Sequence, residues 1–206
     1  MEITKLLQEG KIFIYPTDTI YGLGCNALDV CAVERIKKIK GRDKDKPMSV
    51  IAPSLEWINE NCVVPCLASS QFDFRDIIKP AHLPKIAKIK LNNSHPNNKF
   101  SNSYLKKYLP GPYTLILKKK NQNFLKHVAS GDSLGVRIPN CDFTFKIQES
   151  GVPFITTSVN LSGEKPANNI GEISKEILNN VDFVIDEGEL SGKPSILVIG
   201  DKEIER

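Results

Sequence analysis

The stretch that sets the fold reads Lys11-Ile12-Phe13-Ile14-Tyr15-Pro16-Thr17-Asp18-Thr19-Ile20-Tyr21-Gly22-Leu23-Gly24. Its first five residues are rich in strand formers, and Pro16 ends the run because proline has no amide hydrogen for a sheet ladder. Residues 17–24 then carry hydroxyls, a carboxylate and two glycines, which is typical of a loop. Ligands of α/β proteins bind where strands end. The stretch therefore predicts a buried strand that leads into a polar, functional loop.

Helix and strand patterns continue on both sides of this stretch. Gly10 ends a short helix over residues 3–9, and Asp29 is suited to cap a helix that runs to Lys40, with Gly41 as its C-cap. The Asn-rich segment around residues 92–98 has no such pattern. Since strands and helices intermix without strict βαβ spacing, we expect an α/β protein with a mixed sheet. The remaining signals predict helices from Pro53-Ser54 through Trp57, over 101–109, over 142–149 with Asp142 as cap, and over 172–179, and strands over 48–52, 113–117, 134–138, 153–157, 181–185 and, last, 195–199.

Length and composition fit one soluble cytoplasmic domain. The chain has 206 residues, of which 40% are hydrophobic and 25% are charged, enough for a sizeable core. No apolar run is long enough to cross a membrane, and the N-terminus lacks the apolar region of a signal peptide. The five cysteines are odd in number and not spaced for structural zinc, so we expect free thiols.

The net charge of +4 is mild, but the positive residues gather in three stretches. These are residues 37–46, residues 85–90 and residues 118–120. Basic clusters suit phosphate-bearing partners such as nucleotides and RNA, and a solvated surface is the simpler alternative.

The common catalytic arrangements are absent from the sequence. No Gly-x-Ser-x-Gly nucleophile elbow occurs, and His82, His95 and His127 are not spaced as metal ligands, so no protein-bound metal is expected. Residues 188–195 approach a phosphate-binding P-loop, but Pro194 follows the lysine where a hydroxyl residue is required. The chain therefore has little equipment for acid–base chemistry.

Four groups of polar residues remain near the ends of expected elements. An unpaired guanidinium inside an apolar strand is costly, so Arg137 needs an anion or a partner acid. Each group also has an ordinary structural reading, as a helix cap, an ion pair or a turn. Together, their cations and hydroxyls suit the organisation of phosphates, where catalysis is mostly positioning and charge stabilisation. The groups are Thr17, Asp18, Thr19 and Tyr21; Lys40, Arg42 and Lys46; Arg137; and Ser158, Asn160 and Ser162.

Five segments, in order, resemble the signatures of the threonylcarbamoyl-AMP synthase family, also called the YrdC domain. They are Tyr15–Gly24, Lys40-Gly41-Arg42 with Asp45–Val50, Pro110–Leu115, Ser133–Pro139 and Thr157–Gly163, which carries the family's Ser-x-Asn. The order and approximate spacing agree over nearly the whole chain. The resemblance implies one YrdC-like domain over residues 1–206. Its fold would be α/β (α+β), a twisted, mixed, open sheet flanked by helices, with a concave basic cavity.

The resemblance also implies a reaction. L-threonine and bicarbonate form a carbamate, which attacks the α-phosphate of ATP to give threonylcarbamoyl-AMP and pyrophosphate. Such a nucleotidyltransferase, an L-threonylcarbamoyladenylate synthase, uses ATP with Mg²⁺. Downstream threonylcarbamoyl-transfer proteins then modify tRNA, and tRNA or double-stranded RNA is a possible partner. The carbamate oxygen is the nucleophile, so the protein needs a cationic cavity that excludes water.

The family's functional residues transfer to matching positions of this chain. The polar tetrad that the resemblance marks as catalytic is Lys40, Arg42, Ser158 and Asn160. The implied ATP contacts are Arg42, Lys46, Ser133, Ser158 and Arg206, and the implied L-threonine contacts are Thr19, Arg137, Thr156 and Ser195.

The chain departs from the family pattern at two positions and leaves two alternatives open. Many members have His where Ile51 stands, which would remove a threonine contact, and Leu109 stands where Trp is common. The chain ends before the extra C-terminal domain of the long form, which indicates the short, stand-alone form. One alternative is a YrdC-like RNA-binding protein without synthase activity, which the presence of Ser158 and Asn160 disfavours. The other is the carbamoyl-transfer domain of hydrogenase maturation proteins, whose further domains are absent here.

Overall fold

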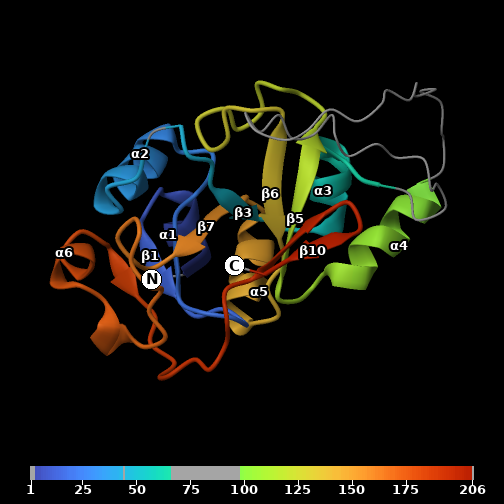
Figure 1. The fold of residues 1–206 in the computed structure, drawn as a ribbon. Coiled ribbons are helices and arrows are strands. Elements are labelled where there is room, and N and C mark those ends of the chain that lie inside the picture. The colour runs from blue at the N-terminus through green and yellow to red at the C-terminus, as the bar shows by residue number, and fades with distance from the viewer. Residues whose placement is uncertain (1–2, 44, 66–97, 206) are drawn as a thin grey trace.

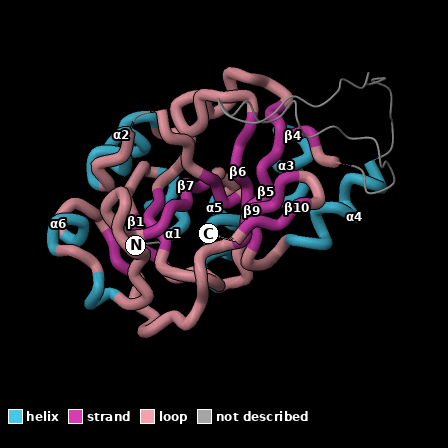
Figure 2. Tube along the Cα trace, in the orientation of Figure 1, coloured by secondary structure: helices cyan, strands magenta, loops and turns pink. Residues whose placement is uncertain are grey.

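Helices surround one twisted sheet in the computed structural model, which describes residues 3–43, 45–65 and 98–205. Figure 1 shows α2 and α6 at one end of the molecule and α3 and α4 at the other, and Figure 2 separates helices, strands and loops. The helices are α1 Ile3–Gln8, α2 Val30–Ile39, α3 Leu55–Asn61, α4 Asn98–Tyr108, α5 Asp142–Ser150 and α6 Lys175–Leu178, with a 3-10 turn at Ile170–Glu172. The strands are β1 Phe13–Tyr15, β2 Gly22–Gly24, β3 Ser49–Ile51, β4 Cys62–Val63, β5 Tyr113–Lys119, β6 Ser133–Arg137, β7 Phe154–Ser158, β8 Phe183–Val184, β9 Ile196–Ile199 and β10 Lys202–Ile204.

The sheet is mixed, as the sequence predicts. Its strand order is β10-β9-β5-β6-β3-β7-β2-β1-β8, with β4 paired to β5 off this path. The pairs β1–β8, β3–β6 and β5–β9 are parallel, and the other pairs are antiparallel. The predicted α/β fold class is therefore confirmed.

One face of the sheet forms the larger core. Successive residues of a strand point to opposite faces, so the pairing register assigns each side chain to a face. Ile14 pairs with Leu23, and Val50 and Leu115 both pair with Val136, which puts these apolar side chains on one face. They pack with buried residues of α2, α3 and α4 in one continuous cluster.

The opposite face has two halves. In the covered half, Phe13, Tyr15, Ile51 and Phe154 pack against α1 and α5. The open half borders a cavity. It consists of Ser49, Gly135, Arg137, Thr156 and Ser158.

Most local predictions are confirmed, with explainable exceptions. Asp29 caps α2 by accepting from the Ala32 amide at 3.0 Å, but Lys40 rather than the predicted Gly41 holds the C-cap position, and Gly41 follows it with φ +55°. The predicted loop 17–24 is too long, because Gly22–Gly24 pairs with β1 as a buried strand. Asp142 is the first residue of α5 rather than its cap; Cys141 holds the cap position.

The C-terminal part contains two further corrections. The predicted helix over 172–179 is split, because Ser174 accepts from the Ile177 amide and begins the separate helix α6. Strand β9 is not the last, because Gly200 at φ +63° turns the chain into β10, which pairs antiparallel with β9. Residues 92–97 lie outside the described residues. Among the described helices, none has the length and apolar character needed to cross a membrane.

Candidate active site

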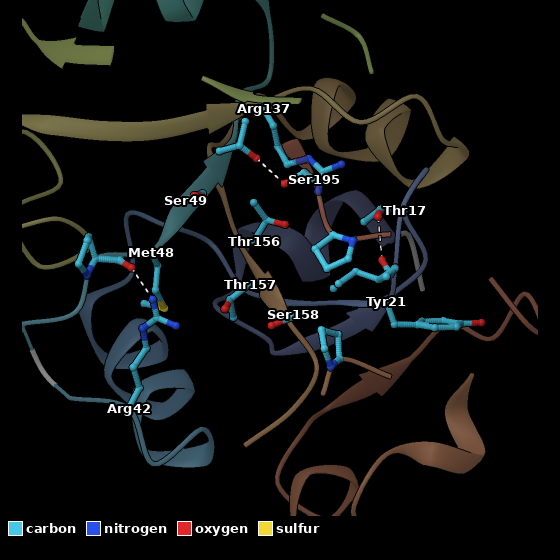
Figure 3. Close-up of a pocket in the computed structure, with 16 residues that line it drawn as sticks. Thr17, Tyr21, Arg42, Met48, Ser49, Arg137, Thr156, Thr157, Ser158 and Ser195 are labelled. Atoms are coloured by element: carbon cyan, nitrogen blue, oxygen red, sulfur yellow. Dashed lines mark hydrogen bonds between the residues drawn. The ribbon is translucent and has the colours of Figure 1, made fainter. Parts of the chain in front are cut away.

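A cavity of about 390 Å³ opens over the open half of the sheet face. This volume lies within the range of small-molecule sites. Figure 3 shows Arg137 and Arg42 approaching the cavity from different sides, with Thr156, Thr157 and Ser158 between them. The lining comes from several segments that are far apart in sequence: Thr17, Ile20, Tyr21, Gly22, Arg42, Pro47, Met48, Ser49, Thr114, Arg137, Thr156, Thr157, Ser158, Pro166, Pro194 and Ser195.

Arg137 lies at the end of β6 and is paired with an acid, as its apolar strand requires. Its Nη2 lies 2.6 Å from Asp18 Oδ1, and both terminal nitrogens reach Thr19 Oγ1 at 3.3–3.4 Å. Burial lowers the pKa of the Arg137 guanidinium, and Asp18 opposes that shift. Its Nε is buried and has no hydrogen-bond partner among the residues that the structure describes. The side chain is therefore fixed by Asp18 and Thr19.

The first loop connects Arg137 to the backbone through hydroxyls. Thr17 Oγ1 donates to the Ile20 carbonyl at 2.7 Å, so Thr19 Oγ1, 2.8 Å away, is the donor between the two threonines. Thr19 can then accept from Arg137. The second oxygen of Asp18 accepts from the Asn140 amide at 2.9 Å, which joins this loop to the chain after β6.

Lys40 is buried behind the residues that line the cavity, and it contacts Ser158 and Asn160 of the predicted tetrad. Its Nζ donates to the backbone carbonyls of Ser158 and Asn160 and, at 3.0 Å, to Asn160 Oδ1. Ser158 Oγ donates to the same amide oxygen. Lys40 is only 2% exposed and does not line the cavity. Burial first, then the neighbouring charges of Arg42 and Lys46, lower the pKa of Lys40 to about 7.

Arg42 faces the cavity opposite Arg137. Gly41, in the left-handed region, turns the chain after α2. Arg42 then donates to the carbonyls of Pro47 at 2.6 Å and Lys46 at 3.3 Å. Partial burial lowers the pKa of its guanidinium. Since these acceptors are neutral, its positive charge remains available to an anion.

The other predicted residues divide by position. Thr156 and Ser195 line the cavity, and Ser195 Oγ lies 2.7 Å from Thr114 Oγ1. Lys46 is exposed and outside the lining. Ser133 lies at the opposite end of β6 from Arg137, paired with Lys118, so the fold does not bring it to the cavity. Arg206 lies outside the described residues.

Several lining residues were not predicted as site residues. Thr114 lies within the third signature segment, and Pro194 lies within the P-loop-like stretch, so both carried a signal in the sequence. Ser49 lies within the second signature segment, Asp45–Val50, but its place at the cavity depends on the register of β3 against β6 and β7. Ile51 is fully buried beside Phe154 and does not line the cavity. Within the described part of the chain, no group of three or more His, Cys, Asp or Glu could hold a metal ion.

Comparisons with known proteins agree with these signatures. The Sua5/YciO/YrdC family model, described as "Telomere recombination", matches residues 5–74 and 75–204. A Methanocaldococcus jannaschii protein, provisionally named threonylcarbamoyl-AMP synthase, is 34% identical over 95% of this chain and 77% of its own length. The Pyrococcus abyssi threonylcarbamoyl-AMP synthase is 28% identical over 89% of this chain, which spans only 45% of that relative.

A solved structure of the P. abyssi protein is also similar to this chain. The P. abyssi Sua5 protein complexed with L-threonine is 26% identical and superposes with a TM-score of 0.69, over 95% of this chain and 48% of that one. The chain thus spans about half of the P. abyssi protein. From the family match over almost its whole length, the chain belongs to the Sua5/YciO/YrdC family, the family that its five ordered signatures indicate.

Proposed function

We propose that this protein synthesises threonylcarbamoyl-AMP from L-threonine, bicarbonate and ATP, with release of pyrophosphate. Support comes from the names of its relatives and from the L-threonine complex of the P. abyssi protein. The observation that carries the proposal is the cavity between Arg42 and Arg137, whose hydroxyl-rich floor includes Ser158 next to the Lys40–Asn160 network. Within this proposal, residues 1–206 act as one domain, since the described strands join one sheet.

The proposed nucleotide side is built around Arg42 and Ser158. Arg42 is a charged donor at the cavity with only neutral partners, which suits it to bind ATP phosphates. Lys40 acts from behind the wall by fixing the carbonyls of Ser158 and Asn160. Contacts of Lys46, Ser133 and Arg206 with ATP remain proposals, and the position of Ser133 gives that contact no support.

The proposed threonine side is built around Arg137. Its positive guanidinium lines the cavity and is held in place by Asp18, which suits it to bind the carboxylate of L-threonine. Thr156 and Ser195 supply hydroxyls to the lining of the cavity, whereas Thr19 lies outside the lining and contacts Arg137 through its hydroxyl. A substrate between the two arginines would have its carbamate directed toward the α-phosphate.

The reaction requires no protein nucleophile. An oxygen of the carbamate forms the new bond to the α-phosphorus, and the bond to the bridging oxygen of pyrophosphate breaks. The protein contributes position, positive charge and exclusion of water. The described residues offer no cluster of metal ligands, so we assign Mg²⁺ no site on the chain; it would arrive with the triphosphate.

The wider role that we propose is tRNA modification in the cytoplasm. Downstream threonylcarbamoyl-transfer proteins would accept the product for transfer to an adenosine of tRNA. The presence of Ser158 and Asn160 and the names of the relatives favour the synthase over an RNA-binding protein without activity.

The proposal is tested by the release of pyrophosphate from the purified protein. We expect release only when ATP, L-threonine and bicarbonate are all present, with threonylcarbamoyl-AMP detected by mass spectrometry. Omission of each substrate in turn is the control. Release that is independent of threonine, or no release with all three substrates, would count against a synthase.

A further inference from the structure

The connection between β8 and β9, residues 185–195, crosses the width of the sheet without a helix or strand of its own. Seven strand spacings separate β8 from β9, roughly 34 Å at about 4.8 Å each. The twelve Cα steps from Val184 to Ile196 reach at most about 43 Å. We call residues 186–195 the strap, and Figure 2 shows it running from the α6 side toward β9 and β10.

Tyr21 holds the first part of the strap. Its ring is fully buried and lines the cavity. Its hydroxyl accepts from the Glu187 amide at 2.9 Å and donates to the Gly188 carbonyl at 2.8 Å, with Asp186 Oδ1 at 3.2 Å as a second acceptor. Three consecutive strap residues therefore depend on one hydroxyl group.

Gly192, in the middle of the strap, lies against the backbone of Thr19 on the proposed threonine side. A Cβ atom at Gly192 would lie 2.0 Å from the Thr19 carbonyl oxygen, so only glycine permits this approach. Thr19 is the residue whose hydroxyl receives Arg137. The strap thus contacts the backbone that orients the buried arginine.

The end of the strap forms part of the cavity wall. Pro194 and Ser195 line the cavity, and Ser195 Oγ meets Thr114 Oγ1. Between these points, the Leu190 amide donates to the Asn168 carbonyl at 2.8 Å, which connects the strap to the loop containing the lining residue Pro166. Because Tyr21, Thr19 and Thr114 contact successive parts of one continuous segment, release of the strap at Tyr21 would also affect Gly192 and Ser195.

We infer that Tyr21 is a positioning residue for L-threonine: its hydroxyl fixes the strap, which holds Thr19 and Ser195 in place and closes that side of the cavity to water. The inference rests on the proposed function. Water that enters this side would attack the carbamoyl carbon of threonylcarbamoyl-AMP. The carbon–oxygen bond to the phosphate would then break, and AMP would leave with that electron pair, giving AMP and the threonine carbamate.

The test is Tyr21→Phe, which removes only the hydroxyl. We expect the KM for L-threonine to rise about tenfold, as for a lost buried hydrogen-bond network, and the KM for ATP to change less than about twofold. The amount of AMP per threonylcarbamoyl-AMP should also rise. Hydrogen exchange should be faster at the Glu187 amide, a readout that needs no catalysis.

Two glycine variants separate strap position from the loss of a hydroxyl. Gly192→Ala keeps Tyr21 but cannot keep the approach to Thr19, so it should also raise the threonine KM. Gly131→Ala, with no atom within 4 Å of the added Cβ, is the matched control and should behave as wild type.

The outcomes distinguish this inference from the proposed function. An inactive wild-type protein overturns the synthase proposal itself. An active wild type with an unchanged threonine KM in both Tyr21→Phe and Gly192→Ala overturns the role of the strap. An equal rise in both KM values, with a lower melting temperature, assigns Tyr21 a structural role only and also overturns it. If Tyr21→Phe does not fold, Gly192→Ala decides the question.

Discussion

The covered and open halves of one sheet face are built on the same strands, but the covered half forms a core and the open half borders the cavity. β3 contributes Ser49 to the open half and Ile51 to the covered half, two residues apart. β7 contributes Thr156 to the first and Phe154 to the second. The boundary is therefore a change of side-chain type along a strand, from large and apolar to small and polar.

The covered half is filled by aromatic rings. Phe154 lies at 5.7–6.0 Å between ring centroids from Phe13, Tyr15 and Phe143, with edge-type geometry in each case. Such packing leaves no room for a ligand. In the open half, Gly135 contributes no side chain, and a Cβ there would lie 2.4 Å from Ser49 Oγ. The cavity therefore exists because small residues stand in the open half at positions where the covered half has large ones. The covered half is packed against α1 and α5.

The largest expected effect is on stability, and it should differ between the two halves. Phe154→Ala should lower the free energy of unfolding by about 3–5 kcal/mol, because it empties the centre of the covered half. Ser49→Ala, in the open half on neighbouring β3, should change it by less than about 0.5 kcal/mol. Urea unfolding of both variants measures this difference. Equal losses would mean that the two halves are not distinct.

The next effect concerns activity in the open half. Arg42→Ala should lower the rate of pyrophosphate release at least about tenfold, since a lost charged contact is worth roughly 1.5–3 kcal/mol. Its unfolding free energy should change little, because the described acceptors of Arg42 are carbonyls in an exposed setting. Arg35→Ala is the matched control, since Arg35 lies outside the cavity lining and forms an ion pair with Asp182 at 3.4 Å near the surface. A wild-type rate for Arg42→Ala would remove Arg42 from the nucleotide side.

A pH dependence should follow from Lys40. Its pKa is lowered to about 7 in the free protein by burial and by Arg42 and Lys46. Bound triphosphate would raise that pKa, so binding would take up a proton above pH 7, and ATP affinity should fall as pH rises from 7 to 9. The fall can reach about tenfold per pH unit. Calorimetry in buffers of different ionisation enthalpy measures the proton uptake, which should be absent in Lys40→Met; uptake that persists there belongs to another group.

The smallest expected effect is a loss of stability on substitution of Gly135 in the open half. Gly135→Ala should cost about 1 kcal/mol of stability, because the new methyl group meets the Ser49 hydroxyl. Adding Ser49→Gly should recover most of that loss, and a double-mutant cycle measures the coupling. Additive losses in the double variant would show that the close approach is relieved elsewhere.

Local signals in the sequence determined most of the elements. Asp29 as a helix cap and the apolar strands 113–117 and 134–138 are confirmed, because caps and hydrophobic periodicity act over a few residues. The split at Ser174 and the added strand β10 were missed, because a short turn of helix and an exposed edge strand have weak patterns.

The family and the two arginines of the site were also accessible from the sequence. The five signatures identify the family, and an arginine in an apolar strand must have a partner, which the fold supplies as Asp18. The absence of Ser133 from the cavity and the contribution of Ser49 were decided by strand register, and the position of Lys40 behind the wall was decided by the packing of the end of α2 against the chain after β7.

The position of the strap is a feature that the tertiary structure shows and the sequence does not. The sequence placed Tyr21 in a candidate polar group and Gly192 in the stretch that approaches a P-loop, but it did not connect the two. Only the strand order, which places β8 and β9 seven spacings apart, brings the chain between them across Tyr21 and Thr19. Register and strand order arise from contacts between distant residues, so no local pattern encodes them.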